Sequence, residues 1–192
     1  EQNQLELIIV GIANSRKILV DENGLSWNQI EKLKEIGQDS NASQFVESIV
    51  GLNLRNTVFI DNTASDQISE QYAALLGNSL SVVTCNKIAG SSATENYDHL
   101  LELAKTKNCH FQYETSVGAA LPIIKTIEDL RLSGDRVHRI QAVLSGSLNF
   151  IFNTYNGSSS FADVVAEAKE QGLTEPDPKI DLSGLDVRRK IL

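Results

Sequence analysis

The residues with the clearest chemical potential lie near the C-terminus of this chain. Carboxylates are concentrated there as Glu175, Asp177, Asp181 and Asp186, and Lys190 follows the last of them by four positions. If this stretch is helical, Asp186 and Lys190 lie on one face. Carboxylates suit a substrate that carries an ammonium group, and a lysine can transfer a proton. A surface ion pair after a proline-stiffened loop has the same spacing, and the spacing alone favours that simpler interpretation.

The composition limits the classes of protein and partner. The chain has 192 residues, of which 41% are hydrophobic, enough for a globular core in one domain or slightly more. Its net charge of −8 argues against a nucleic-acid partner, because phosphate binding needs a basic surface. We recognise neither a signal peptide nor an apolar run long enough for a membrane in these residues, so a soluble protein without a membrane partner is expected. Cys85 and Cys109 form no disulfide framework and have no metal-ligand spacing, which fits a reducing compartment, so a cytoplasmic protein is expected.

The hydrophobic pattern alternates between short buried strands and amphipathic helices. Strands are expected at residues 5–13, 57–61, 80–84, 110–114 and 137–144. Helices are expected to begin at Ser26, at Asn41, near Ile68, near Ser92, at Pro122 and at Ser160, with capping boxes at the first and last of these. Such alternation is typical of an α/β fold with a doubly wound parallel sheet.

Ligands of a doubly wound sheet bind beyond the carboxyl ends of its strands. The polar segments expected at that edge are residues 14–17, 61–65, 86–87 and 114–118. Their donors suit a nucleotide, although every open α/β sheet has polar loops there. The glycine-rich G-x-G-x-x-G motif of dinucleotide folds is absent from the sequence, and Gly11 stands alone. Either this is not a dinucleotide fold, or the chain begins after the first βα unit.

A resemblance over nearly the whole chain supports the second option. The segments that carry it are residues 11–15, 81–87, 113–122, 144–152 and 172–190. They resemble homoserine dehydrogenase, most closely the dehydrogenase part of the bifunctional aspartokinase–homoserine dehydrogenases, with a similar two-helix insertion at residues 24–52. The resemblance implies a partial Rossmann-like NAD(P)-binding domain over residues 1–117, without its first βα unit. Part of an α+β substrate and oligomerisation domain would follow over residues 118–192.

The resemblance also implies an activity, which is the interconversion of L-homoserine and L-aspartate 4-semialdehyde in threonine and methionine biosynthesis. It implies a nicotinamide cofactor and a homo-oligomer. Lys190 and Asp186 match the family's catalytic acid–lysine pair, and Lys87 matches a lysine at the nicotinamide. Glu175 and Asp181 match the family's substrate-binding carboxylates. A free lysine has a pKa of about 10.4; burial or a second cation lowers it and a carboxylate raises it, and the sequence leaves the balance open.

Two further sites are implied by the same resemblance. The cofactor-binding residues are Asn14, Ser15, Arg16, Thr63, Ala64, Ser65, Asn86 and Lys87. The absence of an acid after the first expected strand, together with Arg16 and Lys17, favours NADP over NAD. A loop for a monovalent cation, Na⁺ or K⁺, is formed by Glu114, Val117, Ala119 and Leu121. The residues alone favour a plain strand-to-helix turn at that loop.

Other interpretations stay open. A chain without the glycine-rich unit can be a catalytically inert fragment of the enzyme that acts only in folding or oligomerisation. A nucleotide-fold module for another ligand is a third possibility. Asp181 or Ser183 can also serve only as a cap of the last helix, because Ser183 and Asp186 have capping-box spacing.

Overall fold

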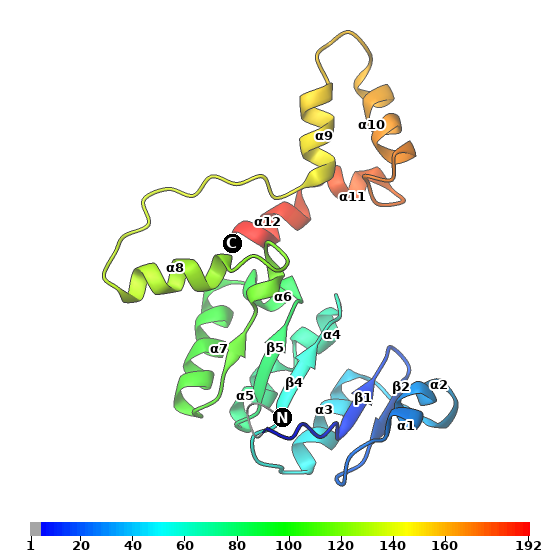
Figure 1. Cartoon of the computed structure of the whole chain (residues 1–192), viewed down its shortest axis with the longest axis vertical. Helices are drawn as coiled ribbons and strands as arrows, with labels where there is room; N and C mark the ends of the chain where they lie inside the picture. Colours follow the sequence, from blue (N-terminus) through cyan, green and yellow to red (C-terminus); the bar gives the residue numbers. More distant parts are fainter. Residues whose placement is uncertain (1–4) are drawn as a thin grey trace. The chain divides into compact units, whose positions relative to one another are not determined.

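The computed structural model describes residues 5–192, which form two compact units (Figure 1). Of the described residues, the N-terminal unit comprises 5–86 and Thr94–Gln112, and the C-terminal unit comprises Lys87–Ala93 and Tyr113–Leu192. The division between the units falls near residue 117, the expected domain boundary. The assignment of the two parts to a cofactor domain and a substrate domain stays a prediction. Among the described residues, no helix is long and apolar enough to cross a membrane.

A parallel sheet forms the centre of the N-terminal unit. Its strands are β4 (Val58–Asp61), β5 (Ser81–Thr84) and β6 (Phe111–Gln112), in the order β4-β5-β6. The helices α4 (Asp66–Ser69) and α5 (Tyr72–Gly77) connect β4 to β5, and α6 (Lys87–Gly90) and α7 (Thr94–Thr106) connect β5 to β6. This arrangement confirms the α/β class and the parallel sheet expected from the sequence.

The core lies between one face of this sheet and the helices α5 and α7. Phe59 of β4, Val82 of β5 and Phe111 of β6 are buried neighbours on that face. The most deeply buried helical side chains are Tyr72, Leu75, Leu76 and Leu100. On the opposite face of the sheet, Val58, Ile60 and Val83 are exposed. The alternation of buried and exposed residues follows the two-residue period of a strand.

A separate antiparallel sheet precedes the parallel one. Its strands are β1 (Gly11–Ala13), β2 (Lys17–Val20) and β3 (Gln38–Asp39), and the helices α1 (Trp27–Glu31), α2 (Leu33–Ile36) and α3 (Ala42–Gly51) belong to the same part of the chain. A Cβ added at Gly11 would lie 2.4 Å from Ile49 of α3, so β1 approaches that helix closely. Phe45 of α3 in turn contacts Phe59 of β4, with the ring centroids 5.8 Å apart.

The expected strand at residues 5–13 was wrong in extent and in direction. Only Gly11–Ala13 is a strand, and it pairs antiparallel with β2. A strand needs a neighbouring strand, and none among the described residues pairs with residues 5–10, where Ile9 and Val10 only accept single backbone hydrogen bonds from Leu25 and Asp21. Leu5 and Leu7 are therefore exposed rather than buried in a sheet.

The C-terminal unit is helical. Its elements are α6, the 3₁₀ turn η1 (Glu114–Ser116), α8 (Ile123–Leu132), α9 (Gly146–Thr154), α10 (Phe161–Glu170), α11 (Pro178–Leu182) and α12 (Leu185–Ile191). Helices α9 and α10 form an antiparallel pair around Ile151, Val164 and Ala168 (Figure 1). Helix α11 contacts α9 and α12, and α12 contacts α6.

The expected strand at residues 137–144 was wrong as well. These residues form neither helix nor strand, and Val137, Ile140 and Val143 are 40%, 57% and 74% exposed. Their alternating pattern suits a sheet face. The described residues contain no strand that pairs with them, so they form no strand and their apolar side chains stay exposed.

Candidate active site

Two lysines flank one carboxylate in the C-terminal unit. Asp186 and Lys190 lie one turn apart on α12, and their Oδ2 and Nζ atoms are 2.5 Å apart. Lys190 Nζ also donates a hydrogen bond of 2.8 Å to the carbonyl oxygen of Leu144. Lys87, the first residue of α6, places its Nζ 3.6 Å from Asp186 Oδ1. The packing of α6 against α12 thus joins residues that are far apart in the sequence.

The charges of this group favour an ionised Asp186. Partial burial alone would raise the pKa of the Asp186 carboxyl, but the hydrogen bond and charge of Lys190, followed by those of Lys87, hold it below its ordinary value. The Asp186 side chain is 57% exposed, so solvent screens the attraction and little stability comes from it. The consequence is chiefly geometric, because the carboxylate holds two ammonium groups close together.

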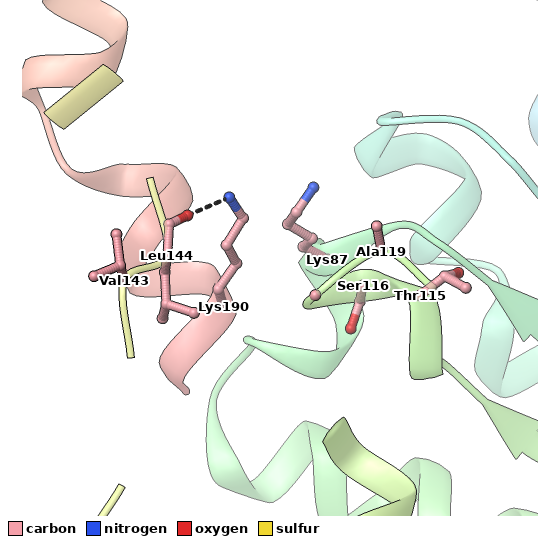
Figure 2. Close-up of a pocket in the computed structure, with 8 residues that line it drawn as sticks. Lys87, Thr115, Ser116, Ala119, Val143, Leu144 and Lys190 are labelled. Carbon is pink, nitrogen blue, oxygen red and sulfur yellow. Dashed lines mark hydrogen bonds between the residues drawn. The ribbon is translucent and has the colours of Figure 1, made fainter. Parts of the chain in front are cut away.

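Both lysines line a cavity of about 390 Å³. The lining residues are Lys87, Thr115, Ser116, Gly118, Ala119, Val143, Leu144 and Lys190. Figure 2 shows Lys190 with Val143 and Leu144 on one side of the cavity and Lys87 with Thr115, Ser116 and Ala119 on the other. The volume suits a small molecule. A ligand there would have two ammonium groups and several hydroxyl and backbone groups within reach.

The two expected substrate carboxylates differ in their surroundings. Asp181 on α11 accepts hydrogen bonds from Ser147 Oγ at 2.7 Å and from the backbone N–H of Glu175 at 2.9 Å. The structure therefore brings Glu175 and Asp181 together, while the side chain of Glu175 itself is exposed. Asp177 is the N-cap of α11 and accepts from the backbone N–H of Lys179.

The capping interpretation was wrong for Asp181 and partly confirmed for Ser183. Gly184, in the left-handed region with φ of 68°, is the N-cap of α12, and Ser183 Oγ accepts from the backbone N–H of Leu185 in the first turn at 3.2 Å. For Ser147, by contrast, no role was predicted from the sequence. It is 5% exposed and holds the Asp181 carboxylate across 34 positions of the chain. A serine in the first turn of α9 has many possible roles, so the sequence offered no signal for this one.

The segments that follow β4 and β5 meet at one edge of the parallel sheet. Asp61 Oδ1 accepts from the backbone N–H of Thr63 at 2.7 Å. The side-chain amide of Asn86 donates to Asp61 Oδ2 at 3.2 Å and to the carbonyl oxygen of Ser65 at 2.8 Å. Thr63, the adjacent exposed Ala64, Ser65 and Asn86 are thereby brought together as the sequence predicted.

The position expected for Asn14, Ser15 and Arg16 was wrong. They form the turn between β1 and β2, and this turn does not follow a strand of the parallel sheet. Asn14 Oδ1 accepts from the backbone N–H groups of Arg16 and Lys17, each at 2.9 Å, which stabilises a tight turn. Lys17 Nζ pairs with Asp39 at 3.1 Å. Their role at the cofactor stays a prediction.

The expected cation loop contains a helix cap. Glu114 accepts from the backbone N–H groups of Ile124 at 2.9 Å and Lys125 at 2.8 Å, so its carboxylate satisfies the first turn of α8. Val117 is buried, Ala119 has φ of 52°, and Leu121 is exposed. Within residues 5–192, no group of three or more His, Cys, Asp or Glu side chains could hold a metal ion. The monovalent-cation site stays a prediction.

Comparisons with known proteins cover nearly the whole chain. Residues 1–114 match the family described as "Homoserine dehydrogenase, NAD binding domain", and residues 122–192 match the family described as "Homoserine dehydrogenase". The bifunctional aspartokinase/homoserine dehydrogenase 1 of Arabidopsis thaliana, described as chloroplastic, is 39% identical over 193 residues, which cover 100% of this chain and 21% of that protein. The bifunctional enzyme of Haemophilus influenzae is 38% identical over 192 residues, covering 100% of this chain and 24% of the relative.

The fold also matches a solved structure. A hyperthermophilic archaeal homoserine dehydrogenase in complex with NADPH superposes with a TM-score of 0.74 and 27% identity, covering 94% of this chain and 57% of that one. The chain thus spans 21% to 24% of the length of the two curated relatives. The two family matches, which together leave only residues 115–121 uncovered, show that this chain belongs to the homoserine dehydrogenase family.

Proposed function

We propose that this protein interconverts L-homoserine and L-aspartate 4-semialdehyde with NADP or NAD. The observation that carries the proposal is the placement of Asp186 between Lys190 and Lys87 at a cavity, in a chain of this family. When bound, the nicotinamide ring accepts a hydride from the substrate carbon in one direction and returns it in the other. The protein must therefore move one proton and hold the substrate.

Lys190 is the candidate for proton transfer. Oxidation of an alcohol releases the hydroxyl proton together with the hydride, so a neutral amine must accept that proton. In the reverse direction, an ammonium group donates it to the aldehyde oxygen. The contacts of Lys190 with Asp186 and with the carbonyl oxygen of Leu144 orient its Nζ atom at the cavity. Lys87 adds a second positive charge at the same carboxylate, with its Nζ 3.6 Å from Asp186 Oδ1.

Glu175 and Asp181 are the candidates for binding the substrate ammonium. A carboxylate has about four acceptor positions, so Asp181 keeps capacity beyond its bonds to Ser147 and to the Glu175 backbone. The exposed side chain of Glu175 forms no ion pair within the described part of the chain, and an ammonium group can bind it directly.

The N-terminal unit contains the residues proposed to bind the cofactor. The residues that would hold the cofactor are Thr63, Ala64, Ser65 and Asn86 at the carboxyl edge of the parallel sheet, where ligands of such folds bind. This donor-rich edge fits a nucleotide. Arg16 on the hairpin turn supports NADP over NAD, because a 2′-phosphate needs a cation. A monovalent cation at Glu114 and assembly into a homo-oligomer complete the proposed function.

The test is to replace Lys190 in the full-length protein. Lys190→Ala should lower kcat by about 10²-fold or more, the usual effect of a lost acid–base group, while the KM for homoserine changes little. The reaction is followed by the absorbance of the reduced cofactor. Lys179→Ala is the matched control, because Lys179 lies on the neighbouring helix α11 and is exposed. An intact kcat in Lys190→Ala would contradict the assignment. A wild-type protein without activity on homoserine would contradict the function.

A further inference from the structure

Four polar side chains are buried together at the carboxyl ends of β4 and β5. They are Asp61, Tyr72, Thr84 and Asn86, and each is at most 2% exposed. We call them the buried polar cluster. Only Asn86 has a role in the proposed function. The other three lie directly beneath the loops that would hold the cofactor, so their arrangement needs an explanation of its own.

No buried side-chain nitrogen or oxygen of the cluster lacks a hydrogen-bond partner. The Asp61 carboxylate accepts from the hydroxyl of Tyr72 at 2.5 Å, from the Asn86 amide at 3.2 Å and from the backbone N–H of Thr63 at 2.7 Å. Because an ionised Asp61 can only accept, the Tyr72 proton must point toward it. The Tyr72 oxygen lies 2.8 Å from Thr84 Oγ1, so the Thr84 hydroxyl donates to Tyr72. Thr84 Oγ1 in turn accepts from the backbone N–H of Asn86 at 2.8 Å.

This chain of hydrogen bonds connects two loops through side chains of three elements. Asp61 and Thr63 lie at the end of β4, Thr84 and Asn86 lie at the end of β5, and Tyr72 reaches both from α5. Asn86 closes the group by donating to the carbonyl oxygen of Ser65. A change in the position of one loop would therefore break bonds in the other.

Burying polar and charged side chains costs desolvation free energy, so this cluster is an inefficient way to stabilise a core. Asp61 has no ion pair with a lysine or arginine among the described residues, so its charge is satisfied by hydrogen bonds alone. Burial, followed by the hydrogen bond to Asp61, raises the pKa of Tyr72, which keeps this residue a neutral donor. Apolar side chains of similar volume would often give equal or greater stability. A polar network in this place instead fixes a single geometry.

We propose that Tyr72 and Asp61 are positioning residues for the nicotinamide cofactor. Through the buried polar cluster they hold the Thr63–Ser65 loop and Asn86 in the one arrangement that binds it. Neither residue needs to touch the cofactor. This inference rests on the proposed function, because it assigns the carboxyl edge of the parallel sheet to the cofactor.

The principal test is Tyr72→Phe in the full-length protein. The substitution removes one hydroxyl and keeps the ring, which packs on Phe111 with the centroids 5.8 Å apart. Leaving a buried carboxylate short of one donor should weaken NADPH binding and raise its KM by about tenfold. The KM for homoserine and the kcat at saturating cofactor should stay within about twofold of the wild type, a split that general destabilisation does not produce.

Val82→Ala is the matched control. Val82 is fully buried on β5, beside the cluster but not in it, and its truncation also destabilises the fold. Melting temperatures of both variants show whether they lose comparable stability. If Val82→Ala raises the KM for NADPH as much as Tyr72→Phe does, the cluster acts only through stability. Thr84→Val provides a second probe if Tyr72→Phe does not fold, because it removes the hydroxyl that accepts from the Asn86 backbone.

Direct binding of NADPH, measured by the fluorescence of the reduced nicotinamide, separates this inference from the proposed function. If the wild-type protein binds NADPH but does not oxidise homoserine, the proposed function fails and the comparison of variants still decides the inference. If Tyr72→Phe binds NADPH with the wild-type affinity, the inference is overturned and the proposed function stays intact. If Tyr72→Phe does not fold, the same result in Thr84→Val overturns the inference. A wild-type protein that binds neither NADPH nor NADH overturns both.

Discussion

At the scale of single residues, Asp186 determines how the two lysines are held. Its pKa lies below its ordinary value because Lys190 and Lys87 outweigh the effect of burial. Asp186→Asn removes the charge that holds both ammonium groups. We expect kcat to fall about tenfold, because Lys190 is then less well oriented. Steady-state kinetics in the direction of homoserine oxidation measures this.

The matched control for Asp186→Asn is Asp129→Asn, which breaks an exposed pair of the same spacing with Lys125 on α8. The control should leave kcat unchanged. An equal loss of activity in both variants would show that the effect comes from helix stability rather than from the lysines. If Asp186→Asn alone retains full activity, the carboxylate has no role in orienting Lys190.

The depressed pKa of Asp186 also fixes the sign of a pH effect on stability. A carboxyl group whose pKa is lower in the folded state stabilises the fold above its unfolded pKa of about 4, and this contribution disappears as the pH falls through the folded pKa. The unfolding free energy of the wild type should exceed that of Asp186→Asn by less than about 1 kcal/mol near neutral pH, because the pair is partly exposed. Urea unfolding at several pH values should show the difference shrinking only below about pH 4.

At the scale of elements, α9 supports the substrate residues through its first turn. Ser147 of this helix holds Asp181, which holds the backbone of Glu175. Ser147→Ala should raise the KM for homoserine by about tenfold, the size expected for one lost hydrogen bond to a charged group, with kcat nearly unchanged. Initial rates at varied homoserine measure it. Ser160→Ala is the control, because it removes the N-cap of α10 at about 1 kcal/mol of stability without reaching Asp181. An unchanged KM in Ser147→Ala would mean that Asp181 does not bind substrate.

The elements also show what the sequence alone can and cannot predict. The capping boxes at Ser26 and Ser160 and the ion pair of Asp186 with Lys190 were predicted correctly, because residues three or four positions apart decide them. The strands of the parallel sheet were predicted from their own alternation and apolar side chains. The segments 5–13 and 137–144 have the same patterns, yet a strand also needs a neighbour, and pairing is not a local property.

The site was predictable to the same extent. The acid–lysine pair follows from spacing within one helix, and the resemblance to a family adds the roles. The bond from Ser147 to Asp181 and the cluster around Tyr72 join positions 34, 11 and 12 residues apart on different elements. No periodicity in the sequence encodes such contacts, because they arise only when separate elements pack together.

At the scale of the whole molecule, the proposed function divides the work between the two compact units. The N-terminal unit carries the loops after β4 and β5, and the C-terminal unit carries Lys190, Asp186, Glu175 and Asp181. Amide hydrogen exchange of the full-length protein can separate these roles, because a ligand that binds only the folded state slows local opening around its site. NADPH should protect the backbone amides of residues 61–65 and 84–86 in the N-terminal unit by about tenfold or more when present well above its dissociation constant. Homoserine should instead protect amides near Glu175 and on α12. Protection of the C-terminal unit alone by NADPH would contradict this division, and with it the assignment of the parallel sheet's carboxyl edge to the cofactor.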